Sequence, residues 1–309
     1  NMLSISVARY LLEGRATMVE HLTGSAHANA ALQPDVEYMP RQRLEHLQRT
    51  FLAQAVTRAA GSAFYRERLR KLSGVIDSLP VERFQERVPL TSKEELRQAG
   101  SAVWVTGAHE HIALLLATSG TTGSRIALPY TRRDLHRWHQ LAARTLWANG
   151  IRPTDVVLLP VPVSLFTGGH GMLGGLTQLG CTVIPTGPAP TATLAEILGG
   201  SLSMLPTAIV SLPSHMLRLL ESLPGAGIDP GSSPLRLGSF GAEPWTEASR
   251  RRIEEGFNLR AYDSYGIGEL CGPGVGAECE QRDGMHIWED AFFVEIVDPT
   301  SGNPVPDGK

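Results

Sequence analysis

Hydroxyl and glycine residues are concentrated in one short segment, residues 118–123, which reads TSGTTG. Glycines let a backbone turn so that successive N–H groups face a single anion, and hydroxyl groups add donors without bulk. Such a segment is suited to holding a phosphate chain, although a flexible surface linker can have the same composition. The residues that would bind phosphate are Thr118, Ser119, Gly120, Thr121, Thr122 and Gly123.

The segment is not the P-loop of nucleoside triphosphatases. That loop closes with a lysine followed by a serine or threonine, whereas Ser124 and Arg125 follow Gly123 here. Arg125 could supply the positive charge for a triphosphate bound at this loop. The planar guanidinium of arginine is not equivalent to a lysine ammonium group.

A second group of chemically active side chains lies nearer the C-terminal end. Cys271, Cys279 and His286 fall within a short, glycine-rich stretch. Cysteine and histidine are zinc ligands, but this spacing is not a standard zinc signature. A structural zinc site is therefore only a minor hypothesis, and zinc is not an expected cofactor. Three cysteines are too few for a disulfide framework, which favours a reducing compartment and a cytoplasmic location.

The elements that must position these residues alternate along the chain. Apolar residues recur at helix spacing over residues 41–71 and 132–146, and Thr131 with Asp134 predicts the start of the second helix. Another helix start is predicted at residues 91–96. This alternation predicts an α/β fold with a mostly parallel, helix-covered sheet. Strands are predicted at residues 111–117, 126–130, 156–161, 182–184, 208–212, 235–239 and 259–263, and further helices near Gly168, Thr191, Pro213 and Thr246.

Composition limits the classes of function. The 309 residues are 42% hydrophobic and 19% charged, as in an ordinary soluble globular protein. The net charge of -3 gives no general attraction to nucleic acid or anionic membranes, so neither is an expected partner. No apolar run approaches the ~18 residues of a membrane-spanning helix, and no secretion signal is recognisable. Residues 1–36 are predicted to be an N-terminal extension, with Asn1 the remainder of an expression tag.

An ordered series of motifs gives the loop a more specific interpretation. They are FYRER (64–68), PLTSKEEL (89–96), FTGGHG (166–171), GAEPW (241–245), YGIGE (265–269), GPGV (272–275) and GMHIWED (284–290). The series resembles the adenylate-forming superfamily of acyl-CoA synthetases, luciferases and peptide-synthetase adenylation domains. It is most similar to the phenylacetate-CoA ligase branch.

This resemblance implies an AMP-binding core domain over residues 37–309. The core would contain helix-covered, mostly parallel sheets. Residues 292–297 and the turn after them would form a β-hairpin that begins a barrel-like subdomain. The core would be incomplete at its C-terminal end, and the C-terminal lid domain, which carries the adenylation lysine, would be absent.

The implied activity is ATP-dependent conversion of an aromatic or arylacetic acid into an acyl-adenylate, with release of pyrophosphate, followed by transfer to CoA. ATP and Mg²⁺ would be the cofactors and CoA a second substrate. By the same analogy a homodimer is expected. One alternative is an adenylating enzyme of aromatic secondary metabolism, such as a phenazine-type antibiotic pathway, that transfers acyl-AMP to a non-CoA acceptor or reductase. A non-catalytic nucleotide-binding homologue is the other.

Residue roles follow from the matching motifs. Residues 118–123 would hold the β- and γ-phosphates, and Glu269 would bind Mg²⁺. The expected catalytic residues are Glu269, Thr122 and His170, the last orienting the carboxylate unless it is a packing residue. Adenine would be bound by Gly241, Ala242, Glu243, Pro244, Tyr262, Asp263, Ser264, Tyr265 and Gly266.

The acid pocket would be built around the FTGGHG motif, whose glycines would leave room for a flat substrate. Tyr265 would stack on adenine, although either Tyr262 or Tyr265 can instead be a core aromatic. One departure from the family is Gly268, which stands where a hydroxyl residue usually precedes the metal-binding glutamate. The acid would be contacted by Phe166, Thr167, Gly168, Gly169, His170, Phe240 and Ile267.

Overall fold

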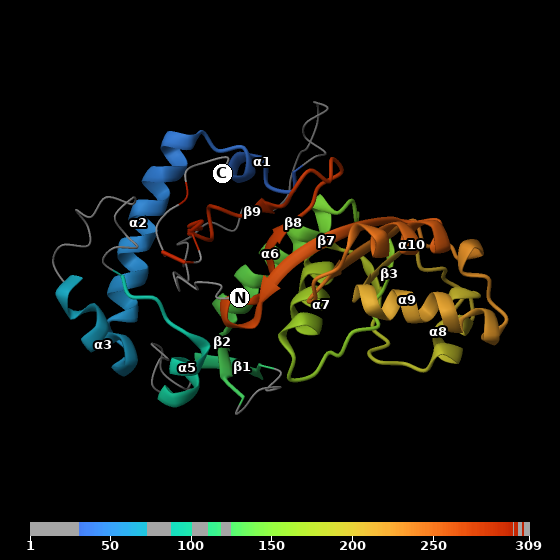
Figure 1. Ribbon diagram of the computed structural model, residues 1–309, viewed down its shortest axis with the longest axis horizontal. Helices are drawn as coiled ribbons and strands as arrows, with labels where there is room; N and C mark the ends of the chain where they lie inside the picture. The colour runs from blue at the N-terminus through green and yellow to red at the C-terminus, as the bar shows by residue number, and fades with distance from the viewer. Residues whose placement is uncertain are drawn as a thin grey trace.

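The computed structural model describes residues 31–72, 88–100, 111–118 and 125–298, together with residues 300, 301 and 305. These residues form an α/β structure with one seven-stranded and one two-stranded sheet. Helices α8, α9 and α10 gather on the right of Figure 1, and α2 and α3 on the left, with β7 running between them. No helix in these ranges combines the length and apolar character that a bilayer-spanning segment needs.

The large sheet has the strand order β4-β3-β5-β6-β7-β8-β9. The first five strands pair in parallel, and β8 and β9 are antiparallel, which confirms the predicted mostly parallel sheet. The strands are β3 (Val156–Leu158), β4 (Thr182–Ile184), β5 (Ala208–Ser211), β6 (Leu237–Gly241), β7 (Arg260–Ile267), β8 (Gly272–Ala277) and β9 (His286–Ile287).

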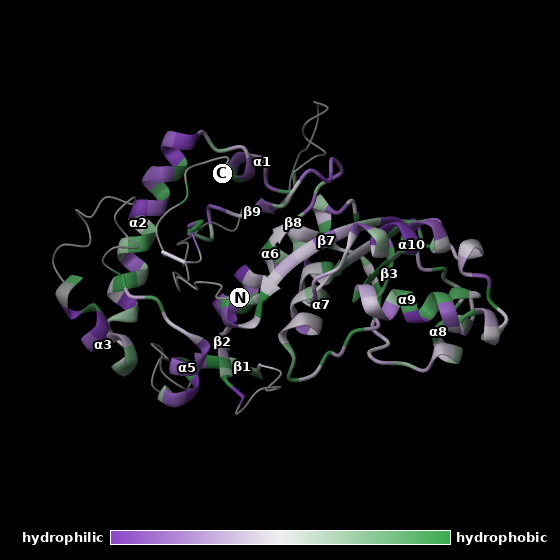
Figure 2. Ribbon diagram, in the orientation of Figure 1, coloured by the Kyte–Doolittle hydropathy of each residue, from purple (hydrophilic) through white to green (hydrophobic). Residues whose placement is uncertain are grey.

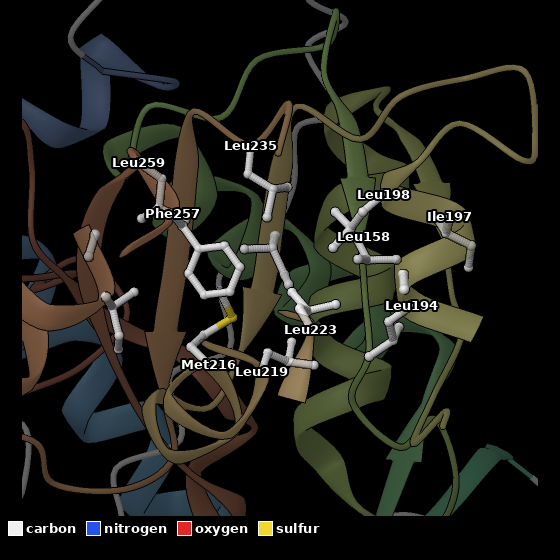
Figure 3. Packing of buried hydrophobic residues seen from close by; sticks show 14 of the residues in the cluster. Leu158, Leu194, Ile197, Leu198, Met216, Leu219, Leu223, Leu235, Phe257 and Leu259 are labelled. Atoms are coloured by element: carbon white, nitrogen blue, oxygen red, sulfur yellow. The ribbon is translucent and has the colours of Figure 1, made fainter. Parts of the chain in front are cut away.

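Helices cover both faces of this sheet. One buried cluster contains residues from α8, α9 and α10 together with Ile209 and Phe240, and Figure 3 shows Phe257 and Met216 within it. The other cluster contains residues from α6 and α7 together with Val210 and Leu237. The helices are α6 (Arg132–Ala148), α7 (Thr167–Leu179), α8 (Thr191–Leu198), α9 (Pro213–Ser222) and α10 (Glu247–Phe257). Short 3₁₀ turns are η5 (Pro224–Ala226), η6 (Pro230–Ser232) and η7 (Gly268–Leu270).

The small sheet pairs β1 (Ile112–Ala117) with β2 (Ala127–Thr131) in antiparallel fashion. It packs with α5 (Lys93–Ala99) around a cluster that includes Leu116 and Trp138 of α6. Strand β1 is continuously apolar, a pattern that is typical of a buried strand. Its residues instead alternate in exposure, and Leu115 is 57% exposed, as in an antiparallel strand with one buried face.

Helix starts agree with the capping signals. Ser92 and Glu95 form a capping box on α5, and Thr131 and Asp134 form another on α6. The N-terminal helices are α1 (Pro34–Glu37), α2 (Arg41–Ala59), α3 (Ala63–Leu69) and the 3₁₀ turn η1 (Arg70–Leu72). Hydrophilic and hydrophobic residues alternate along α2 in Figure 2, and its apolar residues form a cluster with Leu69 and Leu72.

The predicted C-terminal hairpin is present only in part. Residues 292–296 are irregular, and a single bridge residue follows at Val297. The N–H of Val305 donates to the carbonyl oxygen of Ile296, and Asp298 accepts from the N–H groups of Thr300 and Ser301. The described residues after Asp298 therefore form a turn, but the predicted strand before it is absent from residues 292–296.

Candidate functional site

A pocket of about 260 Å³ lies at the carboxyl ends of β5, β6 and β7. In open α/β sheets, ligands bind at this edge because the strand ends and the following loops leave a crevice there. Its walls come from both sheets: Thr118 follows β1, Lys93 begins α5, and the remaining residues belong to the large sheet, to α7 and to the turns and loops next to them. The pocket therefore lies where the small sheet meets the large one.

Thr118 fixes the base of the predicted phosphate loop beside the pocket. Its N–H donates to the carbonyl oxygen of Ile126 at 3.0 Å, and its Oγ1 accepts from the N–H of Ile126 at 3.1 Å. Two reciprocal hydrogen bonds thus hold the two ends of the loop together. The other predicted phosphate-binding residues, Ser119, Gly120, Thr121, Thr122 and Gly123, lie outside the described residues.

Glu269 lines the pocket with a side chain that is only 3% exposed. Its Oε1 lies 2.9 Å from Nζ of Lys93, and it has no hydrogen-bond partner besides this ion pair among the described residues. Burying a carboxylate is costly unless its charge is compensated. A buried carboxylate that faces a cavity and has one cationic neighbour is therefore suited to binding a cation or a cation-bearing ligand.

Lys93 was not among the predicted site residues. It occupies the first turn of α5, which the sequence predicts from the Ser92 cap, and its side chain is 43% exposed. Like Thr118, it lines the pocket. The motif PLTSKEEL contains this lysine, but nothing in the motif indicates that the helix start faces Glu269. Only the packing of the small sheet brings the two residues together.

The GAEP segment brings backbone rather than side chains to the pocket. Gly241 and Ala242 line it, and Ala242 has a left-handed φ of 68°. A Cβ on Gly241 would lie 2.3 Å from the carbonyl oxygen of Ser264, so only glycine fits here. Glu243 instead accepts from the N–H of Ser214, at the start of α9, and Pro244 is exposed outside the pocket.

Three residues of β7 that were predicted to bind the nucleotide differ in their position relative to the pocket. Ser264 lines the pocket, whereas Tyr262 is 2% exposed within the core between the sheet and α6–α7. Tyr262 therefore packs as a core aromatic, the alternative left open by the sequence, and its binding of adenine stays a prediction. Asp263 also lies outside the pocket lining, and burial raises the pKa of its carboxyl group.

Tyr265 packs against the cluster around Val275, while Gly266 and Ile267 supply the pocket wall. Burial raises the pKa of the Tyr265 phenol, and the negative charge of Glu269 raises it further. The tyrosine is therefore near the buried carboxylate, and its stacking on adenine stays a prediction.

The first three residues of the FTGGHG motif belong to the pocket lining. Phe166, Thr167 and Gly168 line the pocket, and Phe166 is 36% exposed. A Cβ on Gly168 would lie 2.4 Å from the Phe166 ring, and one on Gly169 would lie 1.9 Å from the carbonyl oxygen of Pro162. These glycines therefore let the protein pack closely against itself, and the room they would leave for a substrate stays a prediction.

His170 and Phe240 do not line the pocket. Phe240 is fully buried on the opposite face of the sheet, 5.7 Å from the ring of Trp245. His170 lies near His139 of α6, whose pKa is lowered by burial and also by the charges of His136 and His170. The pocket lining therefore does not include these two residues, and their contact with the acid stays a prediction.

The minor zinc hypothesis is also corrected. No group of three histidine, cysteine or acidic side chains in the described part of the chain is arranged to hold a metal. Cys271 packs with the cluster around Leu116 and Trp138. Cys279 and His286 line a separate cavity of about 330 Å³ near α1. The three potential ligands therefore do not converge.

Several pocket residues were missed by sequence analysis. They are buried or half-buried residues near the carboxyl ends of β3, β5 and β6, on α7, or at the start of β8, where the apolar side chains look like ordinary core. Their only signal is their place at the carboxyl end of a predicted strand. They are Val161, Met172, Val210, Ser211, Leu212, Ser239, Gly272 and Pro273.

Comparison with known proteins agrees with this geometry. The model of the AMP-binding enzyme family matches residues 8–309, which includes most of the stretch expected to be an extension. Phenylacetate-coenzyme A ligase of Pseudomonas putida is 39% identical over 246 residues, covering 79% of this chain and 55% of the relative. The Thermus thermophilus ligase of that name is 36% identical, covering 90% and 62%. The chain thus spans about 50–62% of the length of its curated relatives.

Solved structures show the same core. An open conformation of 2-hydroxyisobutyryl-CoA ligase, in complex with 2-HIB-AMP and CoA, is 29% identical with a TM-score of 0.80. It matches 89% of this chain and 66% of that chain. A benzoate CoA ligase from Burkholderia xenovorans is 20% identical with a TM-score of 0.51, which indicates a shared fold only.

Proposed function

The chain belongs to the AMP-binding enzyme family, and from this we propose that it binds Mg-ATP and a carboxylic acid in the described pocket and joins them as an acyl-adenylate. A carboxylate oxygen would attack the α-phosphorus of ATP, the bond from that phosphorus to the pyrophosphate oxygen would break, and pyrophosphate would leave. The relatives named phenylacetate-coenzyme A ligase support an arylacetic or aromatic acid as substrate and CoA as acceptor.

The observation that carries this proposal is the buried Glu269 carboxylate beside Thr118 and Lys93. Attack of one anion on another requires neutralisation of negative charge. Lys93 supplies a positive charge at the pocket, and Glu269 is a hard oxygen ligand of the type that Mg²⁺ prefers. A bound Mg²⁺ would neutralise phosphate charge there, and the residues present fit it.

The remaining roles follow from position. Gly241 and Ala242 expose backbone at the pocket edge, where a flat base can approach closely. The acid would occupy the apolar part, which includes Val161, Met172 and Val210. The missing hydroxyl at Gly268 has a neighbouring substitute, because a Cβ there would lie 3.5 Å from Oγ1 of Thr167.

ATP–pyrophosphate exchange tests the proposal. The protein is incubated with Mg-ATP, labelled pyrophosphate and a panel of benzoic and phenylacetic acids without CoA. Acid-dependent label in ATP is the expected result, and adding CoA with an active acid should then produce a thioester. Mg-ATP binding without exchange would instead favour the non-catalytic homologue. Exchange without CoA-dependent product would favour a different acyl acceptor.

A further inference from the structure

One wall of the pocket places a hydroxyl group next to an apolar side chain. Val210 of β5 and Ser239 of β6 are partners in the parallel register, and both line the pocket. They are 3% and 1% exposed, whereas Phe166 is 36% exposed and the Lys93 side chain 43% exposed. Ser239 therefore lies at the inner end of the pocket, and Phe166 and Lys93 lie nearer its mouth.

The alternation of β6 gives the direction of the Ser239 side chain. Leu237 belongs to the cluster between the sheet and α6–α7, and Phe240 belongs to the cluster on the other face. Successive side chains of a strand point to opposite faces, so Ser239 points to the same side as Leu237. Met172 of α7 lines the pocket from that side.

The hydroxyl proton of Ser239 is donated to a hydrogen bond within the protein. Ser239 Oγ donates to Oδ1 of Asn149 at 2.6 Å, and Nδ2 of Asn149 donates to the carbonyl oxygen of Glu278 at 2.9 Å. Because a carbonyl oxygen can only accept, the second bond fixes which end of the Asn149 amide is the nitrogen. Oδ1 must then accept from Ser239. Only the lone pairs of Ser239 remain available to a ligand.

The acceptor is held in a rigid setting. Asn149 is fully buried, and its backbone N–H donates to the carbonyl oxygen of Thr145. The Glu278 side chain forms a two-point ion pair with Arg250 at 2.8 and 2.9 Å. Reversing the Ser239 hydrogen bond would require the buried Asn149 amide to turn and leave two polar groups unsatisfied, which is unfavourable.

We propose that Ser239 selects carboxylic acids that carry a hydrogen-bond donor, a hydroxyl or amino group, at the end remote from the carboxylate. This rests on the proposed function, which puts the carboxylate near Glu269 and Thr118 and the rest of the acid toward the inner end. A methyl group of similar size at that end would keep water away from Ser239 and leave the lone pairs of its hydroxyl oxygen without a donor. Sites built this way reject the isostere strongly.

The test compares acids that differ in one substituent. Calorimetry measures the dissociation constants of the protein for hydroxy- and amino-substituted benzoic and phenylacetic acids and for their methyl counterparts, with the substituent at each ring position. At one position the donor-bearing acid should bind at least tenfold more tightly than its methyl counterpart, which corresponds to about 1.4 kcal/mol. In Ser239→Ala this ratio should fall to about twofold or less, and in the exposed control Ser201→Ala it should not change.

Ser239→Cys is measured as well, because it keeps the shape but has a weaker acceptor, so it should give an intermediate ratio if Ser239→Ala fails to fold. Equal binding of every donor and methyl pair by the wild-type protein overturns the inference. A preference that survives in both Ser239 variants also overturns it. A separate Mg-ATP titration distinguishes the two failures: nucleotide binding with no donor preference rejects only the Ser239 assignment, whereas no binding of nucleotide or acid rejects the proposed function too.

Discussion

Nζ of Lys93 lies 2.9 Å from Oε1 of Glu269, and this ion pair crosses from the small sheet's helix α5 to the turn that follows β7. The carboxylate is buried and the ammonium group is half exposed at the pocket. The pair therefore joins the two parts of the structure at the place where nucleotide phosphates are proposed to bind.

The first prediction concerns this carboxylate. Glu269→Gln should reduce the Mg²⁺-dependent part of ATP affinity at least tenfold, because a neutral amide is a poorer ligand for a hard cation. Titrations with and without Mg²⁺ would measure it. Glu255→Gln, an exposed change of the same chemistry on α10, should leave the affinity unaltered. Equal loss with and without Mg²⁺ would contradict a metal-binding role.

A second prediction concerns packing at the start of α7. Gly169→Ala should lower the free energy of unfolding by about 2 kcal/mol, because the new Cβ would meet the Pro162 carbonyl oxygen. Alanine's better helix propensity, about 1 kcal/mol, would offset only part of this. Urea unfolding measures the change. Gly225→Ala is the control, since nothing lies within 4 Å of a Cβ there.

The third prediction concerns a hydrogen bond between α6 and the pocket wall. Nε1 of Trp138 donates to the carbonyl oxygen of Pro273 at 2.8 Å, and Trp138 is fully buried. Trp138→Phe should keep most of the apolar contact but leave that carbonyl unsatisfied, at a cost of about 1–3 kcal/mol. Denaturant unfolding provides the readout. A change under ~0.5 kcal/mol would mean that the carbonyl finds another donor.

The fourth prediction is a pH dependence. Burial lowers the pKa of His139, and the charges of His136 and His170 lower it further. Because the pKa of His139 is lower in the folded protein, the unfolded chain binds the proton more readily. The folded protein therefore keeps its full free energy of unfolding above about pH 6.5 and loses part of it as the pH falls through the folded pKa of His139. Unfolding free energy should fall less between pH 7.5 and 5 in His139→Phe than in the wild type. An unchanged pH slope would show that His139 does not contribute.

The fifth prediction concerns the buried pair between Arg250 and Glu278. Removing one member of a buried ion pair with two hydrogen bonds leaves the other charge buried without a partner. Arg250→Met should therefore destabilise the protein by about 3–5 kcal/mol. Arg251→Met changes an exposed neighbour of the same type and should cost less than ~0.5 kcal/mol. Thermal and urea unfolding would compare them.

The fold was largely predictable because its signals are local. Capping residues such as Ser92 and Thr131 mark helix starts, and alternating strands and helices imply a parallel sheet. Strand ends were less certain: β7 continues to Ile267, four residues beyond the predicted end at Asp263. Those added residues carry part of the pocket wall, because β8 pairs with them and no local pattern reveals that pairing.

The site was predicted in part for a related reason. Motifs identify segments, but within each segment the backbone decides which side chains face the pocket. Thus Ser264 faces the pocket while Tyr262 lies in the core, and Phe166 faces it while His170 does not. Lys93 and Ser239 escaped notice because each depends on contacts between distant elements.

The inner wall of the pocket takes its residues one at a time from the ends of neighbouring strands, as with Val210, Ser239 and Ser264. A side-chain substitution leaves the main-chain pairing of these strands in place, so one change alters one point of the wall. The same scaffold could therefore be re-targeted to a different acid by single codon changes. A library restricted to these strand-end positions would be a compact starting point for redesigning its selectivity.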